Sequence, residues 1–287
     1  MNSTPLPFAL TRPAHVDHVH LVVSDLDLVS RFYQRVIGLS VIRSEGREHV
    51  LGAGGRALLT LTQEQNALRA PRSAAGLFHT AFLVPDRQAL ARWASHAADL
   101  NVRLEGASDH LVSEALYLSD PEGNGIEIYR DRQPEEWNFR EDGSVEMATA
   151  RLDMRDLLAA APDQPWTGME EGTVIGHIHL QVGDIAQAES FYRDVLGLKV
   201  MARYPGASFL ATGGYHHHVA ANIWNSRDAV PRVGGMTGLA GYSLRFNDER
   251  LAASALNAAE RLEIPTARTA GGHSLQDPWG IGITLLS

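Results

Sequence analysis

Short stretches in which apolar and polar residues alternate recur along the chain, and a pattern with helical spacing follows them. In VHLVV, at residues 19–23, the alternation has a period of two, which is typical of a strand with one buried face. In the residues that follow, Leu28, Phe32 and Val36 fall on one face of a helix, and Gly38 is typical of a helix C-terminus. The chain is therefore predicted to open with a strand that runs directly into a helix.

The same order of elements returns further along the first half. HTAFLVPD, at residues 79–86, is predicted to form a second strand of this kind, and the helical pattern RQALARWASHAADL follows it. Further strands are predicted at VRLEG, EALYLSD and NGIEIYR. The first half thus contains two units whose strands and helix follow in the order βαβββ.

The second half of the chain repeats the first. The matching pairs lie 159 positions apart (177 minus 18) and include His18 and His177, His20 and His179, Asp25 and Asp184, Phe32 and Phe191, Tyr33 and Tyr192, and Gly38 and Gly197. Further on, GLFHTAFLVPD resembles GLAGYSLRFND, and DPEGNGIEI resembles DPWGIGITL. A gapless repeat of this kind indicates a duplication, so the chain is predicted to contain four βαβββ modules.

A segment of different composition separates the two copies. Residues 131–171 are richer in charge and proline than their surroundings, and they include a short helical pattern near MRDLLAAA. We therefore predict a first domain at 14–133, a linker at 134–172 and a second domain at 173–287.

Composition narrows the classes of function. With 287 residues, 44% apolar and 21% charged, the chain has the make-up of a globular protein with room for two ordinary domains. The absence of cysteine excludes disulfides, thiolate metal sites and cysteine nucleophiles. A formal charge of −9 argues against a nucleic-acid surface, and no apolar run approaches the roughly 18 residues of a membrane span. Since the N-terminus also lacks the pattern of a secretion signal, a cytoplasmic protein that acts on a small molecule is expected.

Three features together resemble one known group of proteins: the order of the elements, the FYxxVxGL ends of two helices, and DPEGNGIEIY. They are similar to the vicinal oxygen chelate superfamily, which includes glyoxalase I, bleomycin-resistance proteins and extradiol dioxygenases. The resemblance covers residues 15–130 and 174–287. Within the group, GASDHLVSEALYLSDPEGNGIEIY and GGYHHH most resemble bacterial catechol 2,3-dioxygenases of the small two-domain type. The resemblance implies an α+β fold of four βαβββ modules in two tandem domains, each a curved mixed sheet that encloses a cavity, with helices outside.

Strand geometry indicates where the chemistry could lie. Side chains alternate between the two faces of a strand, so His18 and His20 share one face and the aliphatic residues between them share the other. The aliphatic set can pack under the helix, which leaves the histidines on the concave face. Glu127, between two isoleucines, and His79, at the head of the next module, are expected on the same side. His18, His79 and Glu127 are therefore predicted to form a facial triad that holds Fe(II) and leaves one side of it open.

The resemblance implies the same ligands. In extradiol dioxygenases they come from the first strand of one module and from the first and last strands of the next, and the first ligand lies seven residues before the strand-ending aspartate. Counting back from Asp25 gives His18, so His20 is expected to support the site or to face the substrate. Fe(II) is the expected cofactor, with Mn(II) or Zn(II) as alternatives. With two neutral imidazoles and one carboxylate, the ion can still bind a catecholate and O2.

The second half lacks the same set of ligands. His177 matches His18, but Gly241 stands at the position of His79 and Thr284 at the position of Glu127. We therefore expect no repeated site, with His177 an inherited position whose partners have been replaced. One alternative is a second metal held by His177 and the histidines of YHHH (215–218); the other is that this histidine-rich segment is a loop, or a strand that caps the first-half pocket.

Acid–base groups are expected near the metal. Tyr117 lies ten residues before Glu127, a spacing at which similar extradiol dioxygenases carry an active-site tyrosine. Asp109 and His110 resemble the polar pair that precedes this tyrosine, and a histidine titrates near neutral pH, which suits proton transfer. Many extradiol dioxygenases also carry an acid–base histidine at the end of the module before the second metal histidine. Here no histidine occupies that stretch before His79, which leaves the proton-transfer residue open between His110, His20 and other histidines.

The leading hypothesis is an Fe(II)-dependent extradiol dioxygenase that cleaves a catechol-like or hydroquinone-like ring. One alternative is a metal-dependent isomerase or lyase of the glyoxalase type, which usually has a fourth protein ligand such as Gln63 or Glu64. Another is a resistance protein that binds an aromatic compound without turnover. The expected partners are a small aromatic substrate and O2, without nucleic acid or membrane. A homo-oligomer is compatible with the class, and the sequence leaves the substrate open.

Overall fold

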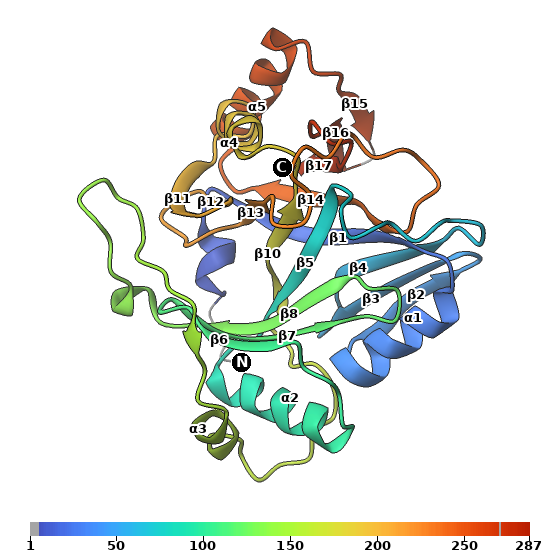
Figure 1. Ribbon diagram of the computed structural model, residues 1–287, viewed down its shortest axis with the longest axis vertical. Helices are drawn as coiled ribbons and strands as arrows, with labels where there is room; N and C mark the ends of the chain where they lie inside the picture. Colours follow the sequence, from blue (N-terminus) through green and yellow to red (C-terminus); the bar gives the residue numbers. More distant parts are fainter. Residues whose placement is uncertain (1–5, 270) are drawn as a thin grey trace.

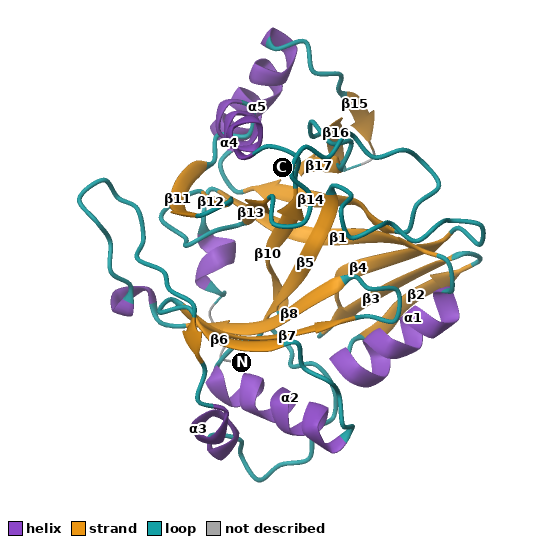
Figure 2. Ribbon diagram, in the orientation of Figure 1, coloured by secondary structure: helices purple, strands orange, loops and turns teal. Residues whose placement is uncertain are grey.

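The computed structural model describes residues 6–269 and 271–287, which form two large curved sheets with helices on their outer sides (Figures 1 and 2). The strands of the first sheet are β1 (Ala14–Val23), β2 (Ser40–Glu45), β3 (Glu48–Ala53), β4 (Arg56–Gln63), β14 (Gly238–Phe246), β15 (Ala267–Thr269), β16 (Gly272–Gln276) and β17 (Gly282–Leu286). The strands of the second are β5 (Gly76–Leu83), β6 (Gly106–Asp109), β7 (Ser113–Ser119), β8 (Gly125–Asp131), β9 (Ala150–Arg151), β10 (Val174–Gln181), β11 (Lys199–Tyr204), β12 (Ala207–Ala211) and β13 (Val219–Asn222). None of the helices in these described ranges is long and apolar enough to cross a membrane.

Each sheet combines one module from each half of the chain. The eight strands of the first sheet follow the order β15-β16-β17-β14-β1-β4-β3-β2, and the nine of the second follow β11-β12-β13-β10-β5-β8-β7-β6-β9. The first strands of the modules meet at the centres of the sheets, where β1 pairs antiparallel with β14 and β5 pairs antiparallel with β10. The predicted α+β class, with four βαβββ modules and mixed sheets, is confirmed. The two predicted domains correspond to the two copies of the sequence repeat. Neither copy forms a separate sheet, because each sheet contains strands from both halves of the chain.

An aspartate at the end of each module's first strand caps the helix that follows. The helices are α1 (Leu26–Phe32), α2 (Arg87–Asp99), α4 (Ile185–Asp194) and α5 (Glu249–Arg261), and a shorter helix, α3 (Met154–Ala159), lies in the linker. The side chains of Asp25, Asp86, Asp184 and Asp248 accept hydrogen bonds from backbone N–H groups of the first turn. Each cap satisfies a donor that would otherwise have no partner within the helix. The order strand, aspartate, helix seen in the sequence thus has a direct physical basis.

The two faces of β1 differ as the alternation predicts. Val19, Leu21 and Val23 are fully buried between the sheet and its helices, whereas His18 and His20 are only partly buried on the opposite face. Similarly, Gly38 ends the first helical segment in a left-handed conformation, at φ 90°, as expected.

One of the three residues predicted to share a face of the first helical segment, Leu28, does not lie on its buried face. Leu28 is 43% exposed, and the segment buries Leu26, Val29, Tyr33 and Ile37 instead. A turn of π-helix at Tyr33–Ile37 follows α1, and it changes the spacing that a regular helix would impose.

The linker is an ordered part of the fold. Residues 150–151 form β9, which pairs with β6 at the edge of the second sheet, and α3 packs against α2 below that sheet (Figure 1). The segment therefore adds to the second sheet as well as connecting the two halves.

Candidate metal centre and cavity

Three side chains with metal-binding atoms converge at the centre of the second sheet. His79 comes from β5, Glu127 from β8 and His177 from β10, and these three strands are neighbours. In the strand pairing, Ala81 is the partner of both Glu127 and His177, so these two residues flank the same position of β5. His79 lies two residues before Ala81 and therefore points to the same face. Within the described residues, this is the group whose ligand atoms lie close enough together to hold one ion.

The distances within this triad fit a single metal ion. The Nε2 atom of His79 lies 2.9 Å from Oε2 of Glu127, Nε2 of His177 lies 3.2 Å from the same oxygen, and the two nitrogens are 3.3 Å apart. With metal–ligand bonds of about 2.1 Å, two ligands at a right angle lie about 3.0 Å apart. The two imidazoles and the carboxylate therefore fit one face of an octahedral ion, and this donor set is the one typical of non-haem Fe(II) sites.

The electrostatics of the triad also favour a bound cation. Burial alone would raise the pKa of Glu127, but His177 and His79 hold it well below its usual range. Burial lowers the pKa of His177 to about 4, although Glu127 acts in the opposite direction. A deprotonated carboxylate and a neutral imidazole are the forms that bind a metal.

His18 is not part of this group, contrary to the prediction. It lies on β1 in the first sheet, where its Nε2 atom is 2.8 Å from Oγ1 of Thr60. The strand pairing gives Ser243 as the partner of both His18 and Thr284, and Gly241 lies two residues before it. Gly241 and Thr284 therefore lie beside His18 in the first sheet, as the repeat indicates. His177 lies beside His79 and Glu127 instead, because each sheet pairs a module of the first half with a module of the second half. The expectation that His177 had lost its partners was wrong for the same reason.

Two other predicted residues also lie outside the triad's surroundings. His20 is in the first sheet, and its Nε2 atom is 2.8 Å from Oγ1 of Thr62. Asp109 forms an ion pair with Arg132 at 2.7 Å and accepts a hydrogen bond from the backbone N–H of Leu111. Neither residue lines the cavity next to the triad, so the structure gives Asp109 the role of a turn cap and ion-pair partner.

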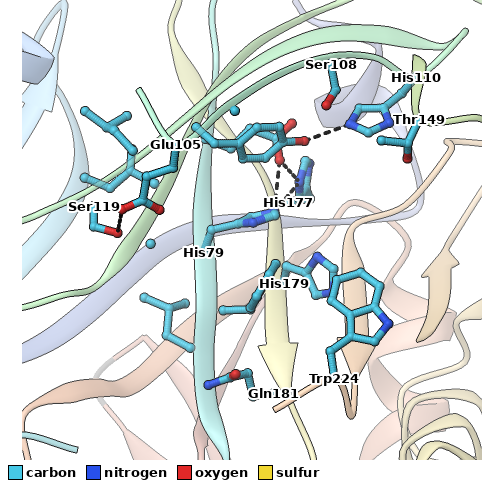
Figure 3. Close-up of a pocket in the computed structure, with 18 of the residues that line it drawn as sticks. His79, Glu105, Ser108, His110, Ser119, Thr149, His177, His179, Gln181 and Trp224 are labelled. Carbon is cyan, nitrogen blue, oxygen red and sulfur yellow. Dashed lines mark hydrogen bonds and ion pairs between the residues drawn. The ribbon is translucent and has the colours of Figure 1, made fainter. Parts of the chain in front are cut away.

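A cavity of about 470 Å³ opens over the triad (Figure 3). It is larger than a single ring needs and lies within the usual range for small-molecule sites. Its lining comes from both halves and from the linker, which contributes Met147, Ala148 and Thr149. In Figure 3, His79 and His177 lie between Ser108, His110 and Thr149 on one side and His179, Gln181 and Trp224 on the other.

Tyr117 and His110 lie together beside the triad, as the sequence predicts. The Nδ1 atom of His110 is 2.7 Å from the carbonyl oxygen of Ala148, which can only accept, so Nδ1 carries a proton. In the neutral ring Nε2 is then an acceptor, and the hydroxyl of Tyr117 donates to it at 2.8 Å. Burial, followed by the charge of Glu127, raises the pKa of Tyr117 well above its usual value. Tyr117 is therefore a neutral phenol beside the metal site.

A second chain of polar side chains reaches the cavity from the opposite side. The Nε2 atom of His216 donates to Oδ1 of Asp131 at 2.8 Å, so in the neutral form of the ring Nδ1 is an acceptor. His217 Nδ1 lies 2.8 Å from that atom and must donate to it. The remaining nitrogen of His217, Nε2, then has a free lone pair, and His217 lines the cavity with its ring centroid 4.1 Å from that of His177.

The sequence pattern does not place His177 with His79 and Glu127, or His217 at the cavity, for identifiable reasons. Both His18 and His177 lie seven residues before a strand-ending aspartate, so spacing alone does not separate them. Residues 212–218 form a loop rather than a strand, and this loop turns His217, instead of His216 and His218, toward the cavity. His216 and His218 bond Asp131 and the carbonyl of Ala9, and within the described residues they form no second metal group. His217 lies before the last strand of the module that contains His177, whereas the corresponding stretch before His79 has no histidine.

Comparisons with known proteins agree with this architecture. The chain is 42% identical over 238 residues to catechol-2,3-dioxygenase of Bacillus subtilis (strain 168), across 80% of this chain and 82% of the relative. Glyoxalase I from Zea mays has a similar structure, with a TM-score of 0.58 and 16% identity, across 98% of this chain and 94% of that one. The cppA protein from Streptococcus pneumoniae TIGR4 also shares the fold, with a TM-score of 0.57 and 11% identity, across 95% and 98% of the two chains.

The family-level comparison covers most of both halves. The sequence pattern of the Glyoxalase/Bleomycin resistance protein/Dioxygenase superfamily matches residues 15–128 and 174–285. These two ranges coincide with the two copies of the internal repeat and include all three side chains of the triad. The chain therefore belongs to the Glyoxalase/Bleomycin resistance protein/Dioxygenase superfamily.

Proposed function

We propose that this protein is an extradiol dioxygenase that binds Fe(II) through His79, Glu127 and His177 and cleaves a catechol-like aromatic ring with O2. The observation that carries the proposal is the convergence of two imidazoles and one carboxylate at a cavity sized for a small molecule. The 42% identity to a catechol-2,3-dioxygenase supports the same reaction class. Mn(II) could occupy the same donor set, whereas Zn(II) prefers a tetrahedral arrangement.

When bound, the metal would supply open positions for the two catechol oxygens and for O2. The rest of the chemistry falls to the chain's own side chains, beginning with a proton that must leave the catechol. His217 Nε2 has a free lone pair toward the cavity, because Asp131 and His216 fix its proton on Nδ1. We therefore assign His217 as the general base that accepts this proton.

A donor is needed later in the reaction, when the ring opens. Tyr117 holds its proton in a hydrogen bond to His110, whose other nitrogen is fixed by the carbonyl of Ala148. When the ring opens, this hydroxyl can turn from His110 to the substrate and donate its hydrogen bond to the oxygen on which charge develops. Base and acid thus approach the metal site from two different chains of hydrogen bonds.

The alternative of a glyoxalase-type isomerase lacks its fourth ligand. Gln63 donates to the carbonyl of Ser24 in the first sheet, and Glu64 lies at a separate surface hollow. Neither residue lines the cavity over the triad. The alternative of a metal-free binding protein predicts that an aromatic ligand still binds after the His79→Ala substitution.

A matched pair of substitutions at equivalent positions of the repeat tests the site. We expect His177→Ala to lose iron, measured by elemental analysis, together with O2 uptake and the yellow ring-fission product formed from catechol. His18→Ala should keep all three, because His18 lies in the other sheet. Glu127→Ala should behave as His177→Ala does.

The reverse result, iron lost in His18→Ala and kept in His177→Ala, would contradict the ligand assignment. Iron-loaded wild-type protein that turns over no simple catechol or hydroquinone would contradict the reaction class. Circular dichroism of each variant separates loss of metal from loss of fold.

A further inference from the structure

One part of the cavity is not used by the metal or by the proton-transfer chains. It lies over β10, beyond His177, where His179 is the next residue on the same face. A step of two residues along a strand is about 6.6 Å, which is comparable to the length of one substituted benzene ring. A ring held at the metal by its two oxygens can therefore extend a substituent over His179.

Three aromatic side chains pack against one another and form one wall of this subsite. The ring centroid of Phe78 lies 4.8 Å from that of His179 and 5.4 Å from that of Trp224, and the last two are 5.6 Å apart. All three residues line the cavity. Trp224 is 50% exposed, although its indole N–H is bound by the carbonyl of Pro205, so an apolar ring face is available to a ligand.

Hydrogen bonds fix the tautomer of His179. Asn222 accepts a bond from the backbone N–H of Trp224 through Oδ1, at 3.1 Å, which orients its amide so that Nδ2 faces His179. Nδ2 lies 3.0 Å from Nε2 of His179 and donates to it, so Nε2 carries no proton. The proton of the neutral ring is then on Nδ1, because the hydrogen bond that the described residues make to the His179 ring is at Nε2. His179 therefore presents one N–H donor within an aromatic-walled subsite.

We infer that His179 is a specificity-determining residue whose Nδ1–H binds an acceptor atom on the substrate, so that the enzyme prefers catechols with a planar, acceptor-bearing substituent such as an acyl group. The inference rests on the proposed function, because it places the diol of the substrate at the metal. Phe78 and Trp224 pack against the flat substituent, and Asn222 is a positioning residue that keeps His179 in the donor form.

Two pairs of catechols of nearly equal shape test the preference. One pair is 4-ethylcatechol and 3,4-dihydroxyacetophenone, and the other is 3-ethylcatechol and 2,3-dihydroxyacetophenone; only the second member of each pair carries a carbonyl acceptor. The dissociation constants are measured anaerobically, by calorimetry, for the iron-loaded protein. The variant His179→Phe keeps a ring and removes the donor, and His179→Asn returns an N–H donor.

We expect the preference for the ketone over the ethyl compound to fall roughly 2- to 12-fold in His179→Phe for at least one pair, which is the usual net effect of one hydrogen bond. His179→Asn should recover part of it, with the iron content unchanged in both variants. A ratio that His179→Phe leaves unchanged in both pairs overturns the role of His179, while O2 uptake by the wild type with any of the four catechols upholds the proposed function. A wild-type protein that binds none of the four ligands overturns both.

The tautomer has a direct readout. Long-range ¹H–¹⁵N spectra of the zinc-loaded protein, with the His179 signal identified by its absence from His179→Phe, should place the proton on Nδ1. In Asn222→Leu this preference should weaken, together with the preference for the ketone. A proton on Nε2 in the wild type would overturn the inference.

Discussion

At the scale of single residues, the positions of the histidine protons around the cavity follow from oxygen atoms that can only accept hydrogen bonds. The carbonyl of Ala148 fixes the proton of His110, and the carboxylate of Asp131 fixes those of His216 and His217 in turn. The two chains leave a hydroxyl donor at Tyr117 and a lone pair at His217. A hydrogen-bond donor and a hydrogen-bond acceptor thus line the cavity beside the triad.

The role of His217 can be tested by its removal. We expect His217→Gln to lower kcat with catechol about 10²- to 10⁴-fold, the usual contribution of a general base. Its iron content should stay at the wild-type value, because the triad is untouched. Steady-state O2 uptake with parallel elemental analysis checks this, and a kcat equal to the wild-type value would exclude His217 as the base.

At the scale of the elements, close approach of strands β5 and β8 holds His79 and Glu127 of the triad in place. Gly125, at the start of β8, packs against the backbone carbonyl of Phe78, the residue before His79. A Cβ atom there would meet that carbonyl, so a larger residue would push the two strands apart. Gly282 holds the equivalent position in the first sheet, where an added Cβ would lie 3.0 Å from the carbonyl oxygen of Ala240.

The two glycines make a matched pair. We expect Gly125→Ala to reduce both the free energy of unfolding and the iron content, because the shift separates His79 from Glu127. Gly282→Ala should have the smaller effect on stability and leave the iron content unchanged. Denaturant unfolding and elemental analysis measure these effects, and equal iron loss in both variants would argue against a local cause.

At the scale of the whole molecule, buried neutral histidines link stability to pH. Burial lowers the pKa of His15 to about 4 and that of His218 to about 3. Unfolding releases both to a value near 6.5, so the unfolded chain takes up more protons on acidification. Their contribution to stability is fully present above about pH 6.5 and is lost as the pH falls toward 4.

Substitution of His15 should remove part of this dependence. We expect the free energy of unfolding of His15→Gln to fall less steeply than that of the wild type between pH 7.5 and 4.5, by on the order of 2 kcal/mol over the range. Urea unfolding of metal-free protein at several pH values gives the comparison. Parallel curves for the two proteins would show that His15 does not titrate on unfolding.

The crosswise pairing of modules makes the metal site a property of both halves. His79 and Glu127 come from the first half and His177 from the second, so residues 1–163 and 164–287, expressed separately, should each fail to bind iron. Mixed together, they should recover iron and O2 uptake. Iron retained at one per chain by the first fragment alone would contradict the crosswise site.

The sequence by itself determined the local parts of this protein. The duplication, the four βαβββ modules and the concave face of His18 and His177 all follow from period and spacing. Two of the three triad residues, His79 and Glu127, were predicted from strand geometry. These features depend on residues close together in the chain, so a local pattern is enough to indicate them.

Only the tertiary structure decided which first strand meets which. Both copies bury the same apolar face, so their pattern fits either pairing equally well. Side chains at equivalent positions of β1 and β10 favour the observed pairing over the alternative. Gly176, on β10, packs directly against Tyr129, which leaves no room for a side chain, and its equivalent on β1 is Asp17. Asp17 instead forms an ion pair with Arg245 of β14, at 3.1 Å, and contacts of this long range are invisible to a local pattern.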